Sequence, residues 1–232
     1  MKPKFRFITA FICLMILDIM AVFSTWFWVV NIIYVTFFIT AVWMFRKNHR
    51  KFNTYLLIFL GFSGLAFMAR IFETTWYFNQ ASLILLTVAY LALIMESVKH
   101  IEMKNASNYM LVYFTLIVGI NGYLLGLHVF DLRIHLSSGL DYVIYIVYYI
   151  NLLILGVFGF IYYLNSYSKK AVYFVSLILA LIFAEVLRDM GVFYLQDPSV
   201  EITEGILRLA VALFAVLFFI TKEKKLRLIN ML

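Results

Sequence analysis

The sequence has few charged residues, prolines and cysteines. Only 13% of its 232 residues are charged, and it has two prolines and ten glycines. Soluble domains have about 25% charged residues, so a soluble globular protein is excluded. The scarcity of proline and glycine also excludes a Pro/Gly-rich linker or a disordered tail. We therefore expect a single domain over residues 1–232.

Several chemical motifs are also missing. The lone cysteine, Cys13, cannot form an intramolecular disulfide or a redox motif. The sequence has no P-loop and no His-Glu-x-x-His motif, and Gly61-Phe62-Ser63-Gly64-Leu65 only resembles a nucleophile elbow. No metal or cofactor is expected.

Apolar residues, by contrast, make up 65% of the chain. A helix needs about 20 of them to cross the hydrocarbon core of a membrane. The sequence predicts eight such spans: Phe7–Phe23, Trp26–Phe45, Thr54–Phe72, Trp76–Ser97, Tyr109–Val129, Tyr142–Leu164, Ala171–Tyr194 and Ile202–Ile220. Only Ser24 and Thr25 separate the first two, which predicts a tight helical hairpin. The expected fold class is an all-α, polytopic membrane helix bundle.

Lysine and arginine are concentrated in every second loop. Of the 19 such residues, 15 fall before the first span, after the second, fourth and sixth spans, or after the last one. The remaining four are Arg70, Arg133, Arg188 and Arg208. The positive-inside rule then predicts that both termini are cytoplasmic. Because topology accounts for the net charge of +7, no nucleic-acid partner is expected.

Ionisable residues interrupt the spans. Glu185, Arg188 and Asp189 stand at i, i+3 and i+4 and so share one helix face. A charge at the centre of a spanning helix costs about 3 kcal/mol, so such groups face the protein interior or a wet cavity. The other polar residues that we expect at outer to middle depth are Asp18, Asn31, Arg70, Glu73, Asn121, Asn151, Glu204 and Arg208. Glu96, near the cytoplasmic end, is expected to form an interfacial ion pair with Lys99 and His100.

This polar cluster has two interpretations. It is either a set of buried ion pairs that fix helix register, or the lining of a pocket that opens outward. In a pocket, the candidate acid and base residues are Glu185, Asp189 and Asp18. The candidate substrate-binding residues are Arg188, Arg208, Arg70, Glu73, Asn121 and Asn151.

Histidines and aromatic residues are expected at the span ends. The four histidines are predicted in or beside loops: His49, His100, His128 and His135. His128 and His135, with Asp131 between them, could bind a metal outside, but a surface loop is favoured. Most of the aromatic residues at the span ends, a set that includes Tyr145 and Tyr194, are predicted to anchor the spans at the membrane interface.

The segment Leu177-Ile178-Leu179-Ala180-Leu181-Ile182-Phe183-Ala184-Glu185 is similar to the seventh-span motif of the YhhN family of lysoplasmalogenases. The eight-span topology also resembles that family. Ala184-Glu185 stands where the family has Ser-Asp, so the resemblance implies that Glu185 is an acidic active-site residue. The third-span Gly-Asp of the family is missing, because Ser63-Gly64 is followed by Leu65.

Family members hydrolyse the vinyl-ether bond of lysoplasmalogens and release a fatty aldehyde. The resemblance implies a protein of the bacterial inner membrane, with membrane lipid as its partner and a lysophospholipid as its substrate. Glu185 would be the acid/base, Asp189 or Asp18 the second carboxylate, and Arg188 and Arg208 a phosphate clamp. The alternative is a non-catalytic membrane protein that binds lipid or serves as a subunit of a membrane complex. A transporter would need a polar path through the cytoplasmic half, where only Glu96 is found.

Overall fold

The computed structural model describes residues 3–24, 27–48, 53–72, 76–100, 108–136, 138–166, 168–195 and 197–223. This part of the chain is helical and has no β-strand. The helices are α1 (Pro3–Phe23), α2 (Phe27–Asn48), α3 (Thr54–Arg70), α4 (Trp76–Val98), α5 (Asn108–Leu132), α6 (Gly139–Ser166), α7 (Lys169–Asp189) and α8 (Pro198–Ile220). Each predicted span coincides with one helix, and the all-α class is confirmed. The predicted seventh span comprises α7 and a π-helical turn, η2 (Met190–Tyr194).

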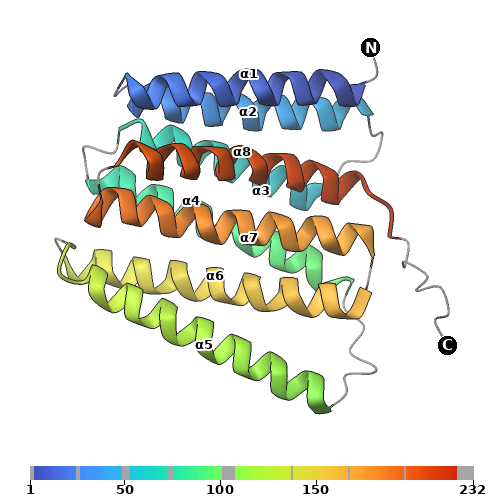
Figure 1. The fold of residues 1–232 in the computed structure, drawn as a ribbon, viewed down its shortest axis with the longest axis vertical. Helices are drawn as coiled ribbons and strands as arrows, with labels where there is room; N and C mark the ends of the chain where they lie inside the picture. The colour runs from blue at the N-terminus through green and yellow to red at the C-terminus, as the bar shows by residue number, and fades with distance from the viewer. Residues whose placement is uncertain are drawn as a thin grey trace.

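The helices lie side by side and run along a common direction, as Figure 1 shows. The pair α1 and α2 lies at one edge of the bundle, and α5 lies at the opposite edge beside α6. Between the edges, α7 packs against α8 and α3 packs against α4. Helix α1 begins and α8 ends at the same end of the bundle (Figure 1).

Helix ends are fixed by local caps. Asn53 caps α3 by accepting hydrogen bonds from the backbone amides of Tyr55 and Leu56, and Ser168 caps α7 through Ala171. Asp197 accepts from the amide of Ser199, with Pro198 in the first turn of α8. These short turns set the register of α7 and α8, which carry four of the nine predicted site residues: Glu185, Arg188, Asp189 and Arg208.

Four segments of the described chain are long and apolar enough to cross a membrane: Tyr77–Val98, Gly139–Ser166, Lys169–Tyr194 and Pro198–Ile220. Four further apolar helical stretches span 10–17 residues each. Large apolar side chains cover the outside of the bundle; Ile39, Trp43 and Val147 are more than half exposed. An apolar surface of this extent is typical of contact with lipid.

The core between the helices is rich in aromatic rings. Phe37, Phe59, Phe174 and Phe218 are fully buried. Tyr145, which the sequence predicted at the membrane interface, is also buried, with 1% of its surface exposed. That prediction was wrong because Tyr145, together with Tyr148 and Tyr149, faces inward on α6.

Candidate functional site

A carboxylate lies between two arginines at the centre of the bundle. Glu185 of α7 places Oε1 2.7 Å from Nη1 of Arg208 and Oε2 3.5 Å from Nη2 of Arg70. The Tyr90 hydroxyl donates to the same Oε1 at 3.0 Å and lies 3.3 Å from the Tyr148 hydroxyl. The three charged side chains are buried, with at most 4% exposed. The predicted acid residue Glu185 is thus held by α3, α4 and α8.

Both arginines are held by further groups. Arg208 Nε donates to Glu204 at 2.6 Å, and Arg70 Nε donates to the Ser82 hydroxyl at 2.9 Å. Each guanidinium carbon lies 5.2 Å from the centre of the Phe67 ring, a distance typical of cation–π contact. We call Glu185, Arg70, Arg208 and Glu204 the central ion cluster.

Asp189 and Arg188, one turn further along α7, contact different helices. Asp189 Oδ2 accepts a short hydrogen bond from the Tyr149 hydroxyl of α6, and it lies 3.3 Å from His128 Nε2 of α5. Arg188 donates to the Asn79 side chain of α4 at 3.0 Å, and its Nη1 lies 3.9 Å from Asp189 Oδ1. The shared helix face of Glu185, Arg188 and Asp189 therefore serves several neighbouring helices.

Asp18 is fully buried on α1 and faces α8. Its carboxylate packs on Gly205, where an added Cβ would lie 1.9 Å from Oδ2 and 2.9 Å from the Tyr34 hydroxyl. Tyr34 lies beside the carboxylate, yet neither oxygen of Asp18 has a partner with hydrogen-bond geometry among the described residues. Asp18 interacts electrostatically with Glu204 and Arg208, so it borders the central ion cluster.

The remaining predicted site residues lie elsewhere. Asn151 donates to the backbone carbonyl of Thr87 at 3.0 Å and so joins α6 to α4. Asn121 lines a groove beside α5. Glu73 lies outside the residues that the structure describes.

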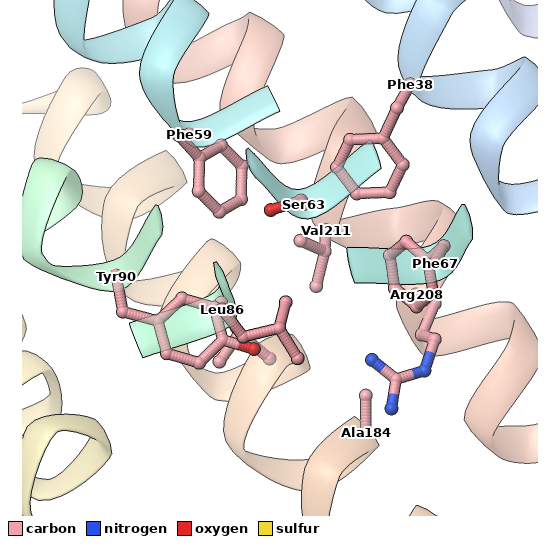
Figure 2. A pocket seen from close by; sticks show the side chains of 10 residues that line it. Phe38, Phe59, Ser63, Phe67, Leu86, Tyr90, Ala184, Arg208 and Val211 are labelled. Atoms are coloured by element: carbon pink, nitrogen blue, oxygen red, sulfur yellow. The ribbon is translucent and has the colours of Figure 1, made fainter. Parts of the chain in front are cut away.

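A small cavity adjoins the central ion cluster. Its volume is about 10 Å³, which is about the room that one water molecule needs. Figure 2 shows the rings of Phe38, Phe59, Phe67 and Tyr90 around it, with Arg208 on the same side as Ala184. The side chains of the central ion cluster pack tightly and bond to one another. This geometry fits the first of the two interpretations, a set of buried ion pairs.

A much larger groove of about 350 Å³ runs between α5, α6 and α7. Its walls are apolar apart from two side chains of α5, Asn121 and His128. On the rim, Leu124 of α5 and Phe183 of α7 are 57% and 56% exposed, so the groove opens on the surface of the bundle. The residues that line it are Val118, Asn121, Leu124, Leu125, His128, Leu152, Leu153, Gly156, Val157, Phe160, Leu179, Ile182, Phe183 and Val186.

A second polar cluster lies at the opposite, lysine-rich end. Glu96 bonds Lys99 at 3.1 Å and Asn53 at 3.2 Å, with His100 at 3.6 Å. The predicted ion pair of Glu96 is therefore confirmed.

Glu223, just beyond α8, lies at the same lysine-rich end of the bundle. Its carboxylate accepts from the Tyr162 hydroxyl at 2.6 Å and from the hydroxyls of Ser166 and Ser168. Burial raises the pKa of Glu223, but these hydrogen bonds outweigh it and hold the pKa below its ordinary value. Sequence reasoning missed this residue because it lies in a charged tail.

His128 is the main residue that sequence reasoning misplaced. It was expected at the surface beside a loop, but its side chain on α5 contacts Asp189 and Tyr149. Among the described residues, no group of three or more His, Cys, Asp or Glu side chains could hold a metal. The inward spacing of Tyr145, Tyr148 and Tyr149 on α6 was the signal that could have identified this polar region.

Comparison with known proteins adds no identification. No family model, curated protein or solved structure matches the chain.

Proposed function

We propose that this protein is an integral membrane protein whose eight helices all cross the bilayer, with the lysine-rich end in the cytoplasm. We further propose that it binds a lipid acyl chain in the groove between α5, α6 and α7. The observation that carries the proposal is the groove itself, with its volume of about 350 Å³ and its apolar walls. Ligand pockets typically have volumes of about 300–1,000 Å³, apolar linings and a few polar groups.

The dimensions of the groove suit one leaflet of a membrane. Along α5 it extends from Val118 to His128, which is about 15 Å at the helical rise of about 1.5 Å per residue. That is half of the hydrocarbon thickness of about 30 Å. His128 lies one turn before the end of α5 at Leu132. An acyl chain whose polar end lies at His128 therefore reaches the middle of the bilayer.

The groove is also accessible from the lipid side. Its rim residues Leu124 and Phe183 are exposed on the outside of the bundle, and α5 has α6 as its main neighbour. A hydrocarbon chain can therefore enter sideways from the bilayer. The cavity beside Glu185, at about 10 Å³, is too small for such a chain, which favours binding in the groove over hydrolysis at Glu185.

The test is to block the groove. Val157→Trp places an indole in it, and Val147→Trp is the matched control, because Val147 lies on the same helix but is exposed and outside the groove. Native mass spectrometry of the protein extracted in mild detergent measures the bound lipid. We expect wild type and Val147→Trp to retain lipid and Val157→Trp to lose it. Equal lipid content in both variants would refute the proposal.

A hydrolase of the lysoplasmalogenase type is the second candidate function. The observation that favours it is the contrast between two carboxyl groups near Arg208: Glu185 is held by two arginines, whereas Asp18 has no hydrogen-bond partner in the described part of the chain. Carboxyl groups in contrasting environments are typical of acid–base catalysis. Vinyl-ether hydrolysis needs a proton on the vinyl carbon and a water on the carbon bonded to oxygen.

The hydrolase is tested by turnover. The purified protein and Glu185→Gln are each incubated with a lysoplasmalogen, and the released fatty aldehyde is measured. The absence of aldehyde with the wild-type protein would refute hydrolysis. Equal rates for both proteins would remove Glu185 from the mechanism.

A further inference from the structure

The polar end of the groove is built around one histidine. His128 lines the groove, and 19% of its side chain is exposed. Its Nε2 lies 3.0 Å from the Tyr149 oxygen and 3.3 Å from Asp189 Oδ2. Asn121, the other polar lining residue, lies two turns deeper, so a ligand head near the outer end meets His128 first.

The surrounding hydrogen bonds determine which ring nitrogen carries a proton. The Tyr149 hydroxyl uses its proton on Asp189, so the tyrosine oxygen and the carboxylate oxygen both face Nε2 as acceptors. Nε2 must then donate, because an ionised carboxylate only accepts. Nδ1 has no hydrogen-bond partner among the described residues. It is therefore the ring nitrogen that can bond to a ligand.

On this geometry, and resting on the proposed function, we propose that the groove binds a long-chain fatty acid whose carboxyl group meets Nδ1 of His128. The acid proton passes from the carboxyl oxygen to Nδ1: the O–H bond breaks, an N–H bond forms, and no further reactant is needed. The product is an imidazolium between two carboxylates, the ligand on one side and Asp189 on the other.

The charges around His128 suit an anionic head. Asp189 faces the imidazole with Oδ2, and Nη1 of Arg188 lies 3.9 Å from its other oxygen, Oδ1. Tyr149 adds a neutral hydroxyl from α6. A cationic head such as choline has no acid proton to give to Nδ1, whereas the carboxylate left after proton transfer neutralises the imidazolium. A fatty alcohol fits the same walls but is too weak an acid to transfer its proton.

The test compares ligands that share one chain and differ in the head. Displacement of a fluorescent fatty acid from the detergent-solubilised protein measures the binding of palmitate, hexadecanol and palmitoyl-lysophosphatidylcholine. Hydrogen bonds to charged groups contribute about 1.5–3 kcal/mol, and 1.4 kcal/mol corresponds to about tenfold in affinity. We therefore expect palmitate to bind at least about tenfold tighter than hexadecanol.

Two variants separate the contribution of the ligand's head group from that of its acyl chain. His128→Gln keeps a polar side chain of similar length but cannot become a cation, so it should lose the preference for palmitate and still bind both ligands. His135→Gln is the matched control, because His135 packs on Phe193 and Tyr194 and does not line the groove. It should keep the wild-type preference.

The outcomes distinguish this inference from the proposed function. If wild type binds all three ligands equally, or prefers the lysophospholipid, and Val157→Trp abolishes binding, then the fatty-acid inference is wrong and lipid binding stands. If no ligand binds to wild type, both fail. The comparison of ligands on wild type alone decides the matter even if His128→Gln does not fold.

Discussion

Replacing Glu185 with glutamine keeps the size of the side chain and removes its charge from the central ion cluster. In the wild type, the carboxylate is 2.7 Å from Arg208 and 3.5 Å from Arg70, and all three side chains are buried. Glutamine can still accept a hydrogen bond from Arg208 and Tyr90. It cannot offset two positive charges, so the arginines repel each other in a dry environment.

The cost can be judged from similar buried pairs. Removing one partner of a buried ion pair costs about 3–5 kcal/mol, because an uncompensated charge remains. Since glutamine retains hydrogen bonds, we expect the lower end, about 3 kcal/mol. For a chain of this size, about 1 kcal/mol lowers the melting temperature by about 2–4 °C, so the expected shift is about 6–12 °C.

Glu204→Gln is the matched control. Glu204 bonds the same arginine, at 2.6 Å, but 17% of its side chain is exposed. Pairs with access to solvent are worth about 0–1 kcal/mol, so the melting temperature should fall by no more than about 4 °C. The double variant Glu185→Gln/Arg70→Gln should recover part of the loss, because it removes one of the two repelling charges.

The assay is thermal unfolding in detergent, followed by the fluorescence of the four tryptophans. Equal shifts for Glu185→Gln and Glu204→Gln would refute the reasoning, because burial and the second arginine would then make no difference. No recovery in the double variant would show that charge repulsion is not the cause of the loss.

Two further predictions concern packing and pH. Gly205→Ala should destabilise the protein by about 1–3 kcal/mol, because the added Cβ overlaps the buried Asp18 carboxylate and approaches Tyr34. Gly159→Ala should cost less, because its close contact is the flexible end of Ile178. Equal shifts in melting temperature for the two variants would contradict this. The pKa of Glu223 is below its ordinary value of 4.5 in the folded state, so its contribution to stability is complete above about pH 4.5 and is lost as the pH falls through the lower, folded value. Glu223→Gln should therefore flatten the acid side of a plot of melting temperature against pH, and an unchanged slope would show that the carboxylate is not held as described.

Much of the fold could be predicted from the sequence, because helix formation in an apolar segment depends on the residues of that segment. Runs of apolar residues between polar loops located all eight helices, and the separation of lysines from the spans located one end of the bundle. The position of Glu185, Asp189 and Arg208 away from the lysine-rich end also followed from their place along each run. Local patterns misplaced His128 and Tyr145, since one turn near a helix end can face either the interior or the surface.

Partner choice could not be predicted, because it depends on which helices pack together. Arg188 stands one turn from Glu185, yet its hydrogen bond is to Asn79, 109 residues away, while Glu185 pairs with Arg208 of α8. The groove likewise exists only because α5 stands apart from α7 along one side of α6. The sequence by itself determined an all-helical chain with helices apolar enough to cross a membrane and with ionisable residues inside them, because hydrophobicity and charge act on each segment separately. Only the tertiary structure decided that Glu185 is enclosed by arginines and that His128 reaches an open groove, because both depend on contacts between distant helices.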